Sequence, residues 1–185
     1  MSTWILIAGL AVAALVLLSA YVSWRAGRLD RLHIRVETAW AALDAALLRR
    51  GAVVLELTGS RALEPASALL LGDAAARARR AHGDGRAARE LAESNLSRAL
   101  RAVLGEPGFA VELAGRPDGA VADVVAEVES AAKRVLLARH FYNDAVSGIR
   151  DARAGRLVRL LRLAGSAPMP EFFEMDDEPP AAERD

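Results

Sequence analysis

The chain opens on an apolar run, and residues 1–24 carry no ionisable side chain. A helix over residues 4–22 would be about 28 Å long at about 1.5 Å per residue, which is close to the thickness of a bilayer's hydrocarbon core. Trp4 stands at one end of this stretch, and Tyr21 and Trp24 stand at the other, where amphipathic rings favour the headgroup level. The pattern predicts a single transmembrane helix over residues 1–24.

Four arginines follow the apolar run: Arg25, Arg28, Arg31 and Arg35. Because positive flanks stay on the cytoplasmic side, we expect the N-terminus outside and the C-terminal domain in the cytoplasm. A cleaved signal peptide would need a charged n-region and a small-x-small cleavage site. The first residues are uncharged and Leu18 stands two positions before Ala20, so a membrane anchor is favoured.

Gly9 and Ala13 form a small-xxx-small pair inside this segment, which would let two helices approach closely as a homodimer. Alanine is abundant throughout the chain, so chance is the favoured explanation of the pair.

Three helical patterns follow the apolar run. A stripe with spacings of four, three and four predicts that the first helix continues to about residue 58, and its members are Val36, Trp40, Leu43 and Leu47. A second helix is expected from Pro65 to about residue 82, and a third over residues 86–104. The short turn at residues 83–85 implies that these two helices are antiparallel.

The strongest periodic signal lies between residues 121 and 149. Spacings of four and three alternate along Val121, Val125, Val128, Ala132, Val135, Arg139, Tyr142, Val146 and Ile149. Such a stripe predicts a long helix packed in a bundle, continuing to about residue 163. Four prolines after residue 165 exclude regular helix there. We therefore expect an all-α protein with an anchor (1–24), an antiparallel four-helix bundle of long, coiled-coil-like helices (25–164) and a Pro-rich acidic tail (165–185) that is disordered from residue 175.

The charges cancel overall but not locally. The chain has 24 Lys+Arg and 24 Asp+Glu, yet residues 148–162 carry five arginines against one acid and residues 171–185 carry seven acids against one arginine. A net charge of zero argues against a nucleic-acid partner. The arginines between residues 150 and 162 suit an anionic membrane surface or an acidic partner, but a solvated face whose nearest partner is the acidic tail is favoured.

Little in the sequence points to catalysis. There is no cysteine, and none of the three histidines has a Glu three residues before it, as a di-metal bundle site would require. The serines show no hydrolase elbow. No metal, no cofactor and no enzymatic activity are expected.

Several polar residues lie on or beside the apolar stripes, where a charge persists only when it is paired. We expect them to form a polar network inside the bundle that fixes helix register, although the same groups would suit a ligand or peptide. They are Asp44, Arg49, Arg50, Asn95, Arg139, Tyr142 and Asn143.

Four segments together resemble the LemA family of bacterial membrane proteins. They are Arg-Val-Glu-Thr-Ala-Trp-Ala-Ala-Leu-Asp at 35–44 with the pair Arg49-Arg50, Ala-Glu-Ser-Asn-Leu-Ser at 92–97, Ala-Arg-His-Phe-Tyr-Asn-Asp-Ala-Val at 138–146, and the closing segment at 165–174. The resemblance implies a membrane-anchored helical bundle and brings no enzymatic mechanism. The chain departs from the family after the Arg pair, at residues 52–57, and again at Ile149-Arg150, where a second Tyr-Asn pair is usual.

Three functions are therefore weighed. A non-enzymatic interaction or scaffold module at the cytoplasmic membrane, with the lipid bilayer and a protein partner at the inner leaflet, is favoured. The alternative is a surface module that binds anionic lipid through residues 25–35 and 150–162. An enzyme is the third, and it lacks a nucleophile–base constellation.

Overall fold

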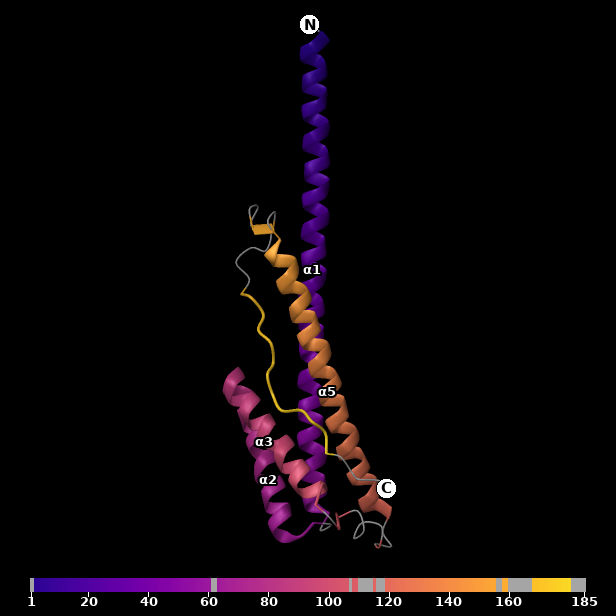
Figure 1. The fold of residues 1–185 in the computed structure, drawn as a ribbon, viewed down its shortest axis with the longest axis vertical. Helices are drawn as coiled ribbons and strands as arrows, with labels where there is room; N and C mark the ends of the chain where they lie inside the picture. Colours follow the sequence, from indigo (N-terminus) through magenta and orange to yellow (C-terminus); the bar gives the residue numbers. More distant parts are fainter. Residues whose placement is uncertain are drawn as a thin grey trace. The chain divides into compact units, whose positions relative to one another are not determined.

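The computed structural model describes residues 2–60, 63–106, 108–109, 115, 119–155, 158–159 and 168–180 (Figure 1). Its elements are α1 (Ser2–Gly59), α2 (Pro65–Arg80), the short 3-10 helix η1 (Ala81–Gly83), α3 (Arg86–Leu104) and α5 (Gly119–Ala154). No strand occurs within these ranges, so the expected all-α class is confirmed. The first, second and third helices end within two residues of the positions that the sequence predicts.

Local chemistry explains where the helices stop and start. The Ser60 hydroxyl donates to the carbonyl of Leu57 at 2.7 Å, which gives one of the last carbonyls of α1 a partner. Pro65 stands in the first turn of α2, where its missing N–H costs no hydrogen bond. Gly85 precedes α3 with a φ of 90°, a conformation that favours glycine.

The chain divides into two compact units. Unit 1 consists of residues 1–38 and 144–171, and unit 2 consists of residues 39–143 and 172–185. Each therefore combines segments that lie far apart in the sequence.

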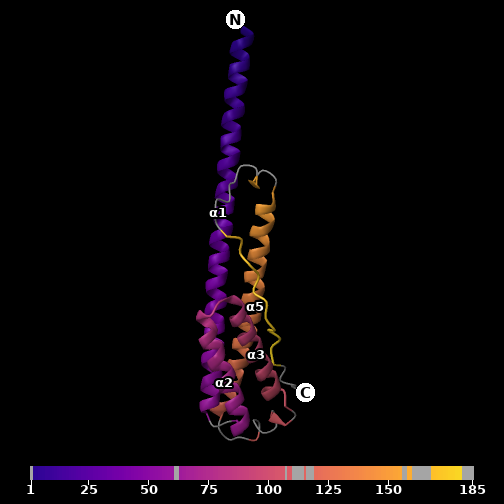
Figure 2. The ribbon, with the colours of Figure 1, turned by 90° about the vertical axis from the view of Figure 1, so that its left-hand side faces the viewer.

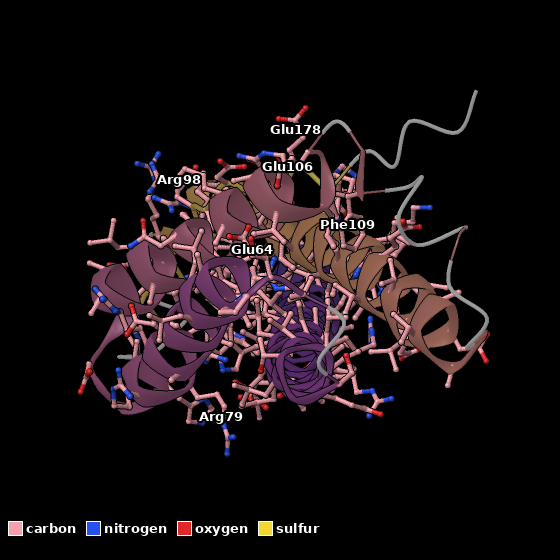
Figure 3. All side chains as sticks on the ribbon, turned by 90° about the horizontal axis from the view of Figure 1, so that it is seen from below. Glu64, Arg79, Arg98, Glu106, Phe109 and Glu178 are labelled. Carbon is pink, nitrogen blue, oxygen red and sulfur yellow. The ribbon has the colours of Figure 1, made fainter. Side chains whose placement is uncertain are left out.

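Unit 2 has a core to which four helical segments contribute side chains. Val54, Leu71, Leu100 and Val128 represent α1, α2, α3 and α5 in it, and all four are fully buried. Seen end-on in Figure 3, charged side chains such as Arg79 and Arg98 project outward from these helices. The predicted stripe of α5 is confirmed, because its apolar members are all buried and only Arg139 retains part of its exposure.

Unit 1 contains the apolar start of α1 and several buried apolar side chains. Leu29, Val146, Ile149 and Val158 are buried in it. Residues 3–22 instead expose nearly all their large apolar side chains, with Trp4 76% accessible. Among the described residues, α1 is the one helix that is long enough and apolar enough to cross a membrane.

The C-terminal segment corrects one expectation. Disorder is expected from residue 175, but residues 172–180 have defined positions (Figure 2). Most residues from Phe172 to Glu178 make hydrogen bonds or ion pairs to α3 or α5. The acidic composition suggested disorder, because composition does not show which basic residues pair with the acids. Arg101 and Arg139, on helices earlier in the chain, are those partners. We call residues 172–178 the strap. Residues 181–185 lie outside the described part of the chain.

Candidate functional site

An aromatic cluster in unit 2 joins α1, α5 and the strap. The ring of Trp40 lies 5.2 Å from that of Tyr142 and 5.7 Å from that of Phe173, measured between centroids. The guanidinium of Arg86 lies over all three rings, 5.1 Å from the Trp40 centroid, and Arg89 approaches Trp40 from 5.4 Å. Phe173 is completely buried, so this cluster combines apolar burial with cation–π attraction.

Side chains of α3 provide hydrogen-bond partners for the strap backbone. Arg86 donates to the carbonyl of Phe172 at 3.3 Å. The backbone N–H of Glu174 donates to Glu90 at 2.9 Å, and that of Asp176 donates to the Ser94 hydroxyl at 3.0 Å.

The register of these hydrogen bonds shows that the strap is extended and parallel to α3. Residues 172, 174 and 176 meet residues 86, 90 and 94, so two strap residues advance for every four helical residues. Four helical residues rise about 6 Å and two extended residues rise about 6.6 Å, which explains why the match holds over successive turns.

Two arginines clamp consecutive acids of the strap. Arg101 of α3 binds both carboxylate oxygens of Asp176, at 2.8 and 2.5 Å. Arg139 of α5 binds both oxygens of Asp177, at 2.5 and 3.1 Å. The hydrogen bond from Arg101 lowers the pKa of the Asp176 carboxyl below its ordinary value, and the same bond raises the pKa of Arg101. Bidentate pairs of this kind are specific for planar anions.

An ion pair is buried between α1 and α3. Arg50 and Glu93 are 1% and 3% exposed and lie 2.7 Å apart, and Arg50 also donates to the Ser97 hydroxyl at 2.8 Å. The Nε atom of Arg50 has no partner among the described residues. A buried pair of this kind gives little net stability, because desolvation offsets the attraction, but it penalises any other helix register.

A second pair lies beside the aromatic cluster. Asp44 of α1 accepts a hydrogen bond from Arg89 of α3 at 2.5 Å, and the imidazole of His82 lies 3.4 Å from the same carboxylate oxygen.

The seven residues predicted to form one polar network separate into groups. Arg139 and Asn143 bind the strap, at Asp177 and Phe173. Tyr142 belongs to the aromatic cluster, where its ring packs against that of Trp40. Asp44 and Arg50 pair with α3. The remaining two make exposed contacts only, Arg49 with Glu127 at 3.3 Å and Asn95 with Arg98 at 2.6 Å.

Their partners on α3 escaped the prediction: Arg86, Arg89, Glu93 and Ser97. A signal was present, because positions 86, 89, 93, 96, 100 and 103 repeat at three and four. The first three positions of this stripe are charged and the last three are apolar. A search for apolar residues alone therefore finds only the last three.

The two arginine-rich segments both belong to unit 1. Arg25 donates to the Tyr21 hydroxyl at 3.0 Å, Arg28 and Arg31 are exposed, and Arg35 lies 3.1 Å from Asp144. Arg150 and Arg153 donate to the backbone carbonyls of Pro170 and Pro168, at 3.4 and 3.0 Å. Asp176 and Asp177 of the acidic tail pair with Arg101 and Arg139.

Within the described part of the chain, no group of three His, Asp or Glu residues is placed to hold a metal ion. An open cavity of about 350 Å³ in unit 2 is lined by Leu55, Ala76, Arg79 and Arg80.

No family model, curated protein or solved structure matches the chain.

Proposed function

We propose that the chain is a LemA-like, membrane-anchored interaction module without enzymatic activity, with its N-terminus outside and unit 2 in the cytoplasm. Unit 2 is the part that meets a protein partner at the inner leaflet. In this proposal its four helical segments form an antiparallel bundle, which agrees with the short connections on either side of α2 and with their shared core.

One observation carries the proposal. The four segments that resemble the LemA family supply both sides of two of the contacts described above. Arg50 of the first segment pairs with Glu93 of the second, and Asn143 of the third binds Phe173 of the fourth. Motif residues that are distant in sequence but bind each other act as one structural set, which is what a genuine family signature predicts.

The charge distribution supports the membrane-bound arrangement. Unit 1 contains nine arginines and five acids, a net of +4, and unit 2 contains fifteen Lys+Arg and nineteen acids, a net of −4. A positive segment directly beside an apolar span suits the anionic inner leaflet, at about 1 kcal/mol for each basic residue near the surface.

Photo-cross-linking in membranes tests the interaction. Leu137 and Phe141 are 52% and 60% exposed on α5, and Leu69 and Leu91 are similarly exposed on the other two helices. A photoreactive residue at these positions should give discrete cross-linked products with a protein partner. Lys133, which is exposed on α5, is the matched polar control. Absence of a product at all four apolar positions would contradict the proposal.

The alternative function is binding of anionic lipid by unit 1, favoured by the union of both arginine-rich segments in that unit. The full chain carrying Arg153→Cys, labelled with a polarity-sensitive dye, would be reconstituted in neutral and in anionic bilayers. A blue shift that needs anionic lipid and disappears at high salt would support this function, and identical spectra would exclude it.

A further inference from the structure

We propose that the surface formed by α3 and α5 beneath the strap is a recognition site for an extended acidic peptide. The peptide carries a buried aromatic residue followed, after two positions, by two consecutive aspartates. The strap occupies this site within the same chain, and an equivalent segment of a partner protein replaces it. This inference rests on the proposed function and names the chemical class of the partner.

The first argument is the kind of contact. Side chains of α3 and α5 form hydrogen bonds with the backbone N–H and C=O groups of the strap. In a sheet or a helix, these backbone groups would bond to other backbone groups. Asn143 binds both backbone groups of Phe173, and Glu90 and Ser94 accept from the next two alternate N–H groups. Side chains spaced by one helical turn can therefore bind the backbone of any extended segment.

The second argument is sequence selectivity. In an extended chain, successive side chains point in opposite directions. Asp176 accordingly reaches Arg101 on α3, and Asp177 reaches Arg139 on α5. Phe173, four residues before Asp177, lies on the same side as that residue and enters the aromatic cluster. Arginine clusters that read acids, together with one aromatic anchor, are a recurring mode of peptide recognition.

The third argument is that the strap is separable from the core. The principal core cluster of unit 2 contains residues of α1, α2, α3 and α5 and no residue of the strap. Removing the strap exposes the aromatic cluster and leaves Arg101 and Arg139 without their carboxylates, while that core keeps its contacts. A competing peptide can therefore take over these interactions without unfolding the helices.

Because the strap is part of the same chain, it competes at a high effective concentration, and an external peptide binds well only when the strap is weakened. The test uses the full chain in detergent micelles with Phe173→Ala, Asp176→Asn and Asp177→Asn, called the released-strap variant. The probe is a fluorescent peptide with the sequence of residues 168–180. A control peptide carries the same three substitutions, and a control protein adds Arg101→Gln and Arg139→Gln.

The expected result is that the probe binds the released-strap variant at least about tenfold more tightly than it binds the natural chain. The control peptide should bind at least about tenfold more weakly, and the added arginine substitutions should abolish binding. Protease cleavage near Met175 reports strap release, with circular dichroism as the check that the helices persist. A strap that stays protected from the protease in the released-strap variant would overturn the inference. If the strap is released, failure of the probe to bind, or equal binding of the probe and the control peptide, would also overturn it.

Two further outcomes separate the alternatives. If differently tagged natural chains co-purify in a manner that depends on Phe173, the ligand is a second copy and the assignment to a partner falls. If the cross-links at Leu137 and Phe141 persist with Arg101→Gln and Arg139→Gln, and the probe also fails to bind the released-strap variant in which both arginines are intact, the proposed function stands and the peptide site does not.

Discussion

The amide of Asn143 binds Phe173 through both of that residue's backbone groups. Its Nδ2 donates to the Phe173 carbonyl at 3.1 Å, and its Oδ1 accepts from the Phe173 N–H at 2.9 Å. Only a side chain with a donor and an acceptor on one planar group can do this, so the position discriminates between asparagine and its isosteres.

Replacing Asn143 by alanine should destabilise strap docking by about 1–3 kcal/mol, because two hydrogen bonds to half-buried groups are lost. Asp at this position should recover only part of the loss, since its carboxylate cannot donate. A chain with Trp4→Phe and Trp24→Phe keeps Trp40 as its one tryptophan, whose fluorescence reports Phe173. Asn95→Ala is the matched control, because Asn95 is exposed, and it should change docking by less than about 0.5 kcal/mol.

The buried pair of Arg50 and Glu93 should behave asymmetrically. Glu93→Met leaves a buried guanidinium without its carboxylate and should lower the free energy of unfolding by about 3–5 kcal/mol. Replacing both residues by methionine removes both charges and should recover most of that loss. Denaturant unfolding of the four chains of this double-mutant cycle measures the coupling. A loss in the double variant equal to the sum of the two single losses would show that the charges do not depend on each other.

Strap docking should weaken in acid. Because Asp176 has a lowered pKa when folded, its contribution is fully present above the ordinary carboxyl pKa and is lost as the pH falls from there through the lower folded pKa. Trp40 fluorescence in the single-tryptophan chain should therefore be constant from about pH 5 to 8 and should change below about pH 4. Asp176→Asn should remove a large part of this transition. A transition near neutral pH would point to another group.

Leu100 and Leu91 provide a matched pair on α3. Leu100 is fully buried in the core of unit 2, and Leu91 is 61% exposed. Leu100→Ala should lower the free energy of unfolding by about 2–5 kcal/mol through lost burial and a residual cavity. Leu91→Ala should change it by less than about 0.5 kcal/mol. Similar losses at both positions would mean that α3 buries another face.

The helices were predictable from sequence because their signals are local. The stripe of α5 identified its buried positions, and Pro65 and the 83–85 turn marked the ends of neighbouring helices. The aromatic cluster was not predictable, since Trp40, Arg86 and Phe173 are separated by 46 and 87 residues. Likewise, no local pattern in the sequence shows that Asp176 and Asp177 pair with arginines of two different helices. The acidic tail was therefore predicted to be disordered.

The position of the strap in the chain sets an order of events during synthesis. Residues 172–178 leave the ribosome after every helix of unit 2, so the core of four helical segments can assemble before Phe173 is available. Until then Phe173 does not cover the ring of Trp40 or the guanidinium of Arg86, and the nascent chain exposes an aromatic surface. Docking of Phe173 can therefore follow as a late step of folding in unit 2, and it is the step that covers the ring of Trp40.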